Sequence, residues 1–324
     1  MAQLTYLEAI ADALRTEMHK DERVFLLGED ISTYGGAFKL TKNFHEEFGR
    51  SRVLDCPISE SAIVGAAIGA ALNGMRPVAE MQFMDFVTCG FNQIVNVAAT
   101  TAYRWGIGVP MVVRGPSGGG VGANPFHSRN SEAWFAHASG VKVVCPAFPA
   151  DAKGLMTASI RDNNPVVFYE HKGLYRKIKE EVPEGEYIIP LGKARIVREG
   201  IHATIVSYGS AVHFALSAAD ELLKEGVSIE VIDIRTLVPF DQETVLASAR
   251  KTSRVLIAHE ASLTAGFGGE IAARIAEHAF EHLDAPIMRV AAYDSPTPFA
   301  PTLEKAVLPN STKVMEATRK LLLY

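Results

Sequence analysis

The sequence predicts an α/β protein with two doubly wound domains, and three observations indicate this fold class. Short apolar runs of strand length alternate with longer stretches in which apolar residues recur at helical spacing. The 324 residues exceed the length of one ordinary domain. Residues 177–186 are charged, contain Pro183 and Gly185 and show no periodicity, as is typical of a linker. We therefore expect a first domain at 1–186, linker included, and a second at 187–324.

The first region begins with an amphipathic helix and continues as strands that alternate with helices. Thr5-Tyr-Leu-Glu8 is a capping-box pattern, which marks the start of a helix. The apolar run 24–27 is typical of a buried parallel strand and ends in Gly28-Glu29-Asp30. Ligands bind at such carboxyl ends in open α/β sheets. Further strands are expected at 53–55, 77–83, 109–114, 141–145 and 166–170. Further helices are expected at 41–48, from Glu60 onward, and at 86–103, 131–138 and 151–160.

The second region repeats this alternation on a smaller scale. Strands are expected at 203–208, 228–234, 254–259 and 286–291, and helices at 211–225, 242–251 and 269–282. Apolar strands that alternate with helices favour a doubly wound parallel sheet in each region.

Composition argues against several classes of protein. The net charge is −5 and no basic run is present, which argues against nucleic acid or an anionic membrane as a partner. Cys56, Cys89 and Cys145 lie far apart and form no Cys-x-x-Cys pair, as expected in a reducing compartment. No apolar run reaches the roughly 20 residues of a membrane span, and no signal-peptide pattern begins the chain. We expect a cytoplasmic protein.

Glu60 is the most unusual residue of the first region, because one carboxylate precedes a long uncharged segment. No charged side chain occurs from Ser61 to Met75, which predicts a helix buried on nearly every face. Burial raises the pKa of a carboxylic acid and keeps it available as an acid or base. The alternative is a helix-end charge favoured by the macrodipole. The residues alone leave both interpretations open.

The glycine-rich loop at 115–122 matches two motifs that we discount. Gly115-Pro-Ser117-Gly-Gly119 fits the nucleophile elbow of hydrolases, but the following glycines and Pro125 cannot start the helix that an elbow requires. Gly118-x-Gly120-x-x-Ala123 fits a dinucleotide fingerprint and lacks the same helix. The loop instead suits a channel wall or gate next to His127, which is a candidate proton donor or substrate ligand. A plain surface loop is the alternative.

Two other groups of residues contain side chains of the kinds that bind metal ions. His278 and His282 lie four apart but lack a third ligand, so a solvated helix face is the favoured interpretation. Asp162-Asn163-Asn164-Pro165 is a turn signature that could also present oxygens to a hard cation.

Together these residues resemble the β subunit of the thiamine-diphosphate-dependent decarboxylase component of 2-oxo acid dehydrogenase complexes, in the transketolase superfamily. The resemblance covers essentially the whole chain. It rests on Gly28-Glu-Asp30, Pro57-Ile-Ser-Glu60, Gly65-x3-Gly69, Arg76-Pro-x-Ala-Glu80, Phe91-x2-Ile-Val-Asn96, His127-Ser128, Asp151-Ala-Lys-Gly154, Arg161-Asp-Asn-Asn-Pro165, Ile234-Arg-Thr-Leu-x-Pro239, His259-Glu260, Gly266-Phe-Gly268, Asp294 and Pro296. It implies a pyrimidine-binding domain followed by a transketolase C-terminal-type domain.

The resemblance also implies roles for individual residues. Glu60 would hydrogen-bond the aminopyrimidine ring of thiamine diphosphate, and His127 would assist acyl transfer to a lipoyl arm. Glu29, near the pyrimidine, would belong to a proton relay between paired active sites. The pyrimidine pocket would contain Ile58, Ser59, Gln82 and Phe86, and the substrate would meet Phe83, Phe86 and His127. A structural potassium ion would be held by Ser159, Asp162 and Asn164 with backbone oxygens near Met111 and Val112. Some relatives carry other side chains at Ser159 and Phe86.

A motif that holds the cofactor's metal ion in this superfamily is absent from the sequence. Enzymes of this superfamily hold Mg²⁺, which clamps the diphosphate, with a Gly-Asp-Gly motif, and this chain contains no Gly-Asp dipeptide. The resemblance therefore implies an α subunit that holds the Mg²⁺, in an α2β2 heterotetramer that serves a dihydrolipoyl acyltransferase core and its lipoyl domain.

The favoured activity is oxidative decarboxylation of branched-chain 2-oxo acids, because Ile63-Val-Gly65 and Ala79-Glu-Met-Gln-Phe83 resemble that branch. Pyruvate or acetoin dehydrogenase is the alternative within the family. A serine hydrolase that uses Ser117 and a non-catalytic assembly subunit are the alternatives from other classes.

Overall fold

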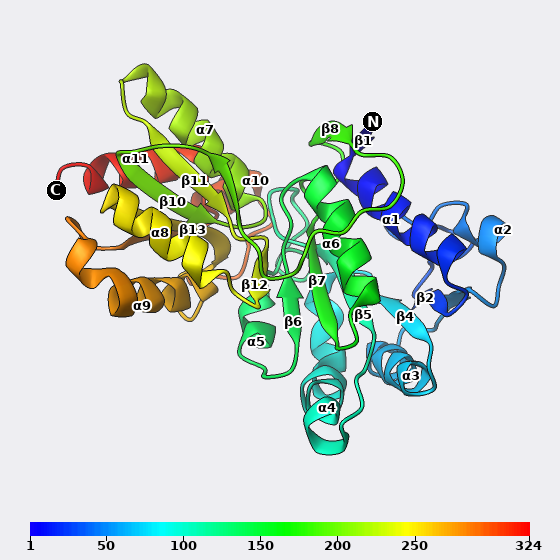
Figure 1. Cartoon of the computed structure of the whole chain (residues 1–324). Helices are drawn as coiled ribbons and strands as arrows, with labels where there is room; N and C mark the ends of the chain where they lie inside the picture. Colours follow the sequence, from blue (N-terminus) through cyan, green and yellow to red (C-terminus); the bar gives the residue numbers. More distant parts are fainter. The chain divides into compact units, whose positions relative to one another are not determined.

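A computed structural model describes residues 1–324, which fold into two units. Unit 1 comprises Met1–Ser117 and Trp134–Leu191, and unit 2 comprises Gly118–Ala133 and Gly192–Tyr324. The chain thus enters unit 2 twice, first as a segment of sixteen residues inserted between two parts of unit 1. The boundary expected at residue 187 did not anticipate this inserted segment. Each unit is an α/β sheet covered by helices, as the sequence predicts (Figure 1).

Unit 1 is built on a parallel sheet with the strand order β6-β7-β5-β4-β2-β3. A separate antiparallel pair joins β1 to β8, so part of the expected linker is a strand. The strands are β1 (Ala2–Thr5), β2 (Val24–Gly28), β3 (Val53–Asp55), β4 (Arg76–Glu80), β5 (Val112–Ser117), β6 (Lys142–Val144), β7 (Val166–His171) and β8 (Lys179–Val182). The register places Gly28 beside both Asp55 and Glu80, so β2, β3 and β4 end at the same edge.

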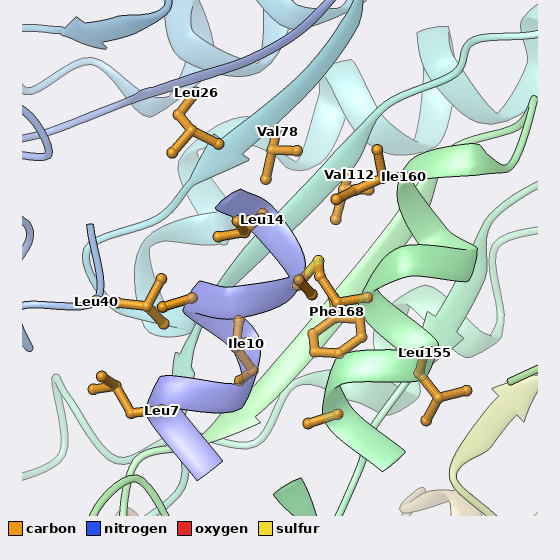
Figure 2. Packing of buried hydrophobic residues seen from close by; sticks show 14 of the residues in the cluster. Leu7, Ile10, Leu14, Leu26, Leu40, Val78, Val112, Leu155, Ile160 and Phe168 are labelled. Atoms are coloured by element: carbon orange, nitrogen blue, oxygen red, sulfur yellow. The ribbon is translucent and has the colours of Figure 1, made fainter. Parts of the chain in front are cut away.

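Helices cover both faces of this sheet. On one face, α1 (Tyr6–Lys20) packs on α6 (Pro149–Arg161) above a core of aliphatic side chains from the strands (Figure 2). The capping box predicted for α1 is present, with Thr5 and Glu8 bonded to each other's backbone amides. On the other face, α3 (Glu60–Leu72) contacts β2 and β4. Successive side chains of a strand point to opposite faces, which is why β2, with helices on both sides, is apolar throughout.

Two helices of unit 1 differ from the prediction. The helix expected at 86–103 is divided into a 3₁₀ segment η1 (Met84–Gly90), a π-helical segment η2 (Gln93–Ala98) and α4 (Ala99–Trp105). Gly90, at the end of η1, packs closely on α3, because a Cβ there would lie 2.8 Å from Val64 Cγ2. The helix expected at 41–48 is only α2 (Phe44–Phe48), since Asn43 before it has a positive φ of 67°.

Unit 2 contains a second sheet with the strand order β14-β13-β10-β11-β9, in which only β9 is antiparallel. Helices α7 and α11 lie together on one side, and α8 and α9 on the other (Figure 1). The elements are β9 (Arg195–Arg198), β10 (Ala203–Ser207), α7 (Ala211–Lys224), β11 (Ile229–Asp233), β12 (Thr236–Val238), α8 (Gln242–Thr252), β13 (Val255–Ser262), α9 (Phe267–Ala279), η3 (Phe280–His282), β14 (Met288–Ala292), α10 (Pro301–Val307) and α11 (Ser311–Leu321). No helix of the chain combines the length and apolar character required to span a bilayer.

Candidate active site

The carboxyl edge of the sheet in unit 1 carries the pair Glu29 and Glu60. Glu29 follows directly after β2, and the backbone amide of Cys56, just after β3, donates to the carbonyl of Gly28 at 2.8 Å. This contact brings the end of β3 beside the end of β2, and four residues later the chain starts α3 with Glu60. Both carboxylates are buried. The fold therefore places two acids at an edge where α/β proteins bind ligands.

The electrostatics of this pair favour a protonated carboxyl group. Burial raises the pKa of Glu29, and the neighbouring charges of Glu60 and Asp30 raise it further. Glu29 accepts a hydrogen bond from the backbone amide of Ser59, but its buried Oε1 has no hydrogen-bond partner. A buried acceptor without a partner is costly, so a polar group of a ligand is the natural occupant of this position.

The other residues predicted around the pyrimidine lie on the same edge. Gln82 and Phe83 follow β4, and the rings of Phe83 and Phe86 are perpendicular, with centroids 6.2 Å apart. Ile58 is 85% exposed, an unusual position for a large aliphatic side chain. Unit 1 therefore brings Glu29, Ile58, Ser59, Glu60, Gln82, Phe83 and Phe86 to one end of its strands.

Helix α3 is less buried than the sequence predicted. Ile63, Val64 and Ala67 are buried, whereas Ala62 and Ala66 are exposed on the other side of the helix. The prediction of burial on nearly every face is therefore wrong for the single chain. Small residues cover the exposed side, which is why the sequence showed no polar face there.

His127 lies in unit 2, within the inserted segment, and is half-buried. Its backbone amide donates to the carbonyl of Asn124 at 3.3 Å, as part of a turn in which Asn124 has a positive φ of 65°. Ser117 ends β5 and is buried, and no helix begins before Glu132. The geometry of a nucleophile elbow is therefore absent at Ser117.

A further buried acid, Glu132, lies near the end of the inserted segment. Glu132 is buried and accepts a hydrogen bond from the Tyr208 hydroxyl at 2.9 Å. Burial raises the pKa of Glu132 to about 7. Tyr208 stacks on the buried ring of His259 with 5.8 Å between centroids, and burial lowers the pKa of His259 to about 4. His259 is therefore neutral at physiological pH. Sequence analysis assigned no role to Glu132.

Sequence analysis also missed an ionic network beneath the carboxyl edge of unit 1. Arg114, fully buried on β5, forms ion pairs with Glu80 of β4 and Glu170 of β7. The Tyr175 hydroxyl donates to Glu170 Oε2 at 2.7 Å. Burial raises the pKa of Glu80, and Arg114 opposes that shift. One signal was available: a charged residue within an apolar strand must find a buried partner.

The residues predicted to hold potassium lie at the other end of the strands of the same sheet, where β5 and β7 begin. Met111 and Val112 stand at the start of β5, and Asp162 and Asn164 precede β7. Asp162 forms an ion pair with Lys142, and the Ser159 hydroxyl donates to the Leu155 carbonyl at 2.7 Å. A bound cation would share the Asp162 carboxylate with Lys142. His278 and His282 lie at the surface, and the chain has no group of three His, Cys, Asp or Glu residues that could hold a metal.

Both units resemble known proteins. Residues 2–177 match the family described as transketolase, pyrimidine binding domain, and residues 192–314 match transketolase, C-terminal domain. The chain is 48% identical to the 2-oxoisovalerate dehydrogenase subunit beta of Bacillus subtilis and 47% identical to the pyruvate dehydrogenase E1 component subunit beta of the same species. Each match covers 99% of both chains. The solved structure of a split gene transketolase, an inactive β4 tetramer, has the same fold with a TM-score of 0.81 at 23% identity, over 99% of both chains.

Proposed function

The chain belongs to the transketolase-like β subunits of 2-oxo acid dehydrogenases, and we propose that it provides the acid-base half of an active site that an α subunit completes. The reaction would be oxidative decarboxylation of a branched-chain 2-oxo acid, with transfer of the acyl group to lipoyl-lysine of a dihydrolipoyl acyltransferase core. The observation that carries the proposal is the buried pair Glu29 and Glu60, at the carboxyl edge of the unit that matches the pyrimidine-binding family.

The residues at this edge suit the pyrimidine half of thiamine diphosphate. The partnerless oxygen of Glu29 and the buried carboxyl group of Glu60 offer sites for the polar edge of an aminopyrimidine, and Phe86 and Ile58 offer apolar surface for its ring. Glu60, a buried carboxyl group, would hold a proton toward a ring nitrogen. When bound, the cofactor stabilises the negative charge left on the substrate carbon as CO₂ departs.

The substrate and acceptor would meet aromatic and imidazole side chains. Phe83 and Phe86 present apolar surface that suits a branched aliphatic side chain. We expect His127 to donate a proton or a hydrogen bond during acyl transfer to the lipoyl arm, because an imidazole ring can donate through its nitrogen atoms.

An α subunit in an α2β2 heterotetramer would supply the diphosphate half, with its Mg²⁺. Large apolar side chains stand exposed on unit 1, among them Ile58 and Tyr103, the latter 95% exposed, together with Trp105 and Ile107. Exposed apolar surface of this kind favours a protein partner. Mixing the purified chain with a partner that contains Gly-Asp-Gly should produce thiamine-diphosphate binding, measured by calorimetry. Equal binding by this chain alone would contradict the split site.

Two substrates fit relatives of nearly equal similarity, since the two proteins from Bacillus subtilis differ by only one per cent in identity to this chain. Pyruvate is therefore the second candidate. Steady-state rates of the assembled enzyme with 3-methyl-2-oxobutanoate and with pyruvate distinguish them. We expect the higher kcat/KM for 3-methyl-2-oxobutanoate. A clear preference for pyruvate would contradict the branched-chain proposal.

Potassium at the amino edge of unit 1 is proposed as a structural ion held by oxygens from Met111, Val112, Ser159, Asp162 and Asn164. Oxygen ligands suit a hard cation. Replacing potassium by sodium in the buffer should lower the thermal unfolding temperature of the wild-type complex, and Asp162→Asn should abolish that difference. Equal unfolding temperatures of the wild type in both salts would remove the ion from the proposal.

A further inference from the structure

The glycine-rich start of the inserted segment has backbone amides arranged to bind an anion. Gly118, Gly120 and Gly122 all have positive φ, at 82°, 80° and 69°, and alternate with residues of ordinary conformation. Such alternation turns successive amides toward one side and forms a concave anion-binding site. Glycine at these positions also leaves the segment free to adopt many other conformations unless something holds it.

Glu304 of α10 occupies this concave site. Its Oε1 accepts the amide of Gly120 at 2.9 Å, and its Oε2 accepts the amide of Gly122 at 3.1 Å. The side chain is buried, and a Cβ on Gly119 would lie 2.7 Å from Leu308 Cδ1, so the segment approaches α10 closely. Both oxygens of one carboxylate are thus engaged by the same short stretch of backbone.

The helix that carries Glu304 is itself fixed. Pro301 stands in its first turn, where a fixed φ favours a helix start. The Lys313 ammonium donates to the Leu308 carbonyl at 2.7 Å, just beyond the end of α10. Glu304 therefore approaches the segment from a helix whose end is bonded to Lys313 of α11.

Glu260, near the carboxyl end of β13, contacts the same segment near both of its ends. Its Oε1 accepts the Gly119 amide at 2.6 Å and the Asn130 side-chain amide at 3.0 Å. Its Oε2 accepts the Ser210 hydroxyl at 2.7 Å. One oxygen thus joins the two ends of the loop that contains His127, and Glu304 holds the part between.

We propose that Glu304 is a positioning residue for acyl transfer: its carboxylate fixes the segment 118–133 and thereby the place of His127. The inference rests on the proposed role of His127 and adds a residue that contacts neither substrate nor cofactor. A carboxylate suits this task because hydrogen bonds from backbone amides to an ionised acceptor are stronger than those to a neutral one. Glutamine would keep the length but present an NH₂ group to one of the two amides.

The test compares two rates of the assembled α2β2 enzyme. Decarboxylation is followed with an artificial dye as oxidant, and acyl transfer is followed with a free lipoyl domain. We expect Glu304→Gln to leave the dye-linked rate within about threefold of wild type and to lower acyl transfer by roughly 10- to 100-fold, as for a misplaced catalytic group. Amide hydrogen exchange in peptides that cover 118–133 should become faster in the variant, a readout that requires no turnover.

Three further variants distinguish the possible outcomes. Glu316→Gln removes an exposed carboxylate from α11 in the same unit and should change neither rate nor exchange. His127→Ala tests the proposed function: unchanged acyl transfer in that variant would overturn the role of His127 itself. Loss of acyl transfer in His127→Ala with full activity in Glu304→Gln would overturn only the positioning role. Glu304→Asp, which retains the charge, serves if the glutamine variant does not assemble. Failure of both to assemble would make Glu304 a stability residue and overturn the proposal.

Discussion

Glu29 and Glu60 come from different strand ends and lie close enough for the charge of Glu60 to raise the pKa of Glu29. Two buried carboxyl groups that interact in this way are disfavoured from ionising together. The charge of Glu60 therefore favours the protonated form of Glu29. A carboxyl group that keeps its proton can donate it toward a weakly basic ring.

Replacing Glu60 by glutamine should lower the decarboxylation rate of the assembled enzyme by roughly two or more orders of magnitude, because the change removes an acid-base group and retains its shape. The measurement is the steady-state rate with the preferred 2-oxo acid. Glu46→Gln, which changes an exposed residue of α2, is the matched control and should retain full activity. An active Glu60→Gln enzyme would show that this chain serves only as an assembly subunit.

Arg114→Met should destabilise the protein by roughly 3–5 kcal/mol, since it leaves the carboxylates of Glu80 and Glu170 buried without their cation. Chemical denaturation of the complex measures the loss. The surface pair of Arg23 with Asp21 provides the comparison, because Arg23→Met removes an exposed ion pair and should cost no more than about 1 kcal/mol. Equal losses in the two variants would refute the importance of burial at Arg114.

Glu132 should make stability depend on pH, because its pKa is raised from 4.5 to about 7 in the folded protein. Between these values the unfolded chain has released this proton while the folded chain retains it, so stability falls as pH rises. The contribution is complete below 4.5 and is lost as pH passes through about 7.

Glu132→Gln removes this proton and should flatten the profile. We expect the stability of the wild type relative to the variant to fall by roughly 2 kcal/mol from about pH 5.5 to about pH 8. Denaturant titrations at several pH values give both curves. Parallel curves would show that the pKa of Glu132 in the folded protein is not raised.

Gly268→Ala should destabilise unit 2 by about 1–3 kcal/mol, because the new Cβ would lie 2.5 Å from Nε2 of the buried His259. The adjacent Gly269 on the same helix provides the control. Its Cβ would meet nothing closer than Arg289 Nη1 at 3.5 Å, so Gly269→Ala should be neutral or slightly stabilising. Thermal unfolding of both variants distinguishes crowding at His259 from a general effect of alanine in α9.

Local patterns predicted the elements that local interactions determine. The capping box at Thr5 starts α1, and the apolar runs form the parallel strands of both sheets. The acidic residues after β2 lie at the edge where the pair with Glu60 forms. The break within 84–105 was not predictable in this way, and Gly90 there packs against Val64 of another helix, a contact that no local pattern contains.

The rest of the candidate site depends on pairings that no window of sequence contains. Arg114 within an apolar strand required a buried partner, but only the register of β4, β5 and β7 shows that Glu80 and Glu170 are the partners. The sequence predicts a channel wall, a gate or a plain surface loop at 115–122, and nothing within the loop itself indicates what holds it. Its anchors, Glu260 and Glu304, come from the last quarter of the chain.

These long separations set an order of events during synthesis. Gly119 lies 141 positions before Glu260, and Gly120 lies 184 positions before Glu304. A ribosome that has completed every strand of unit 1 has therefore not yet made either anchor. The loop with His127 therefore stays unclamped on the nascent chain until first Glu260 and then Glu304 have been made, so premature termination after unit 1 would yield a product with this loop open to proteases.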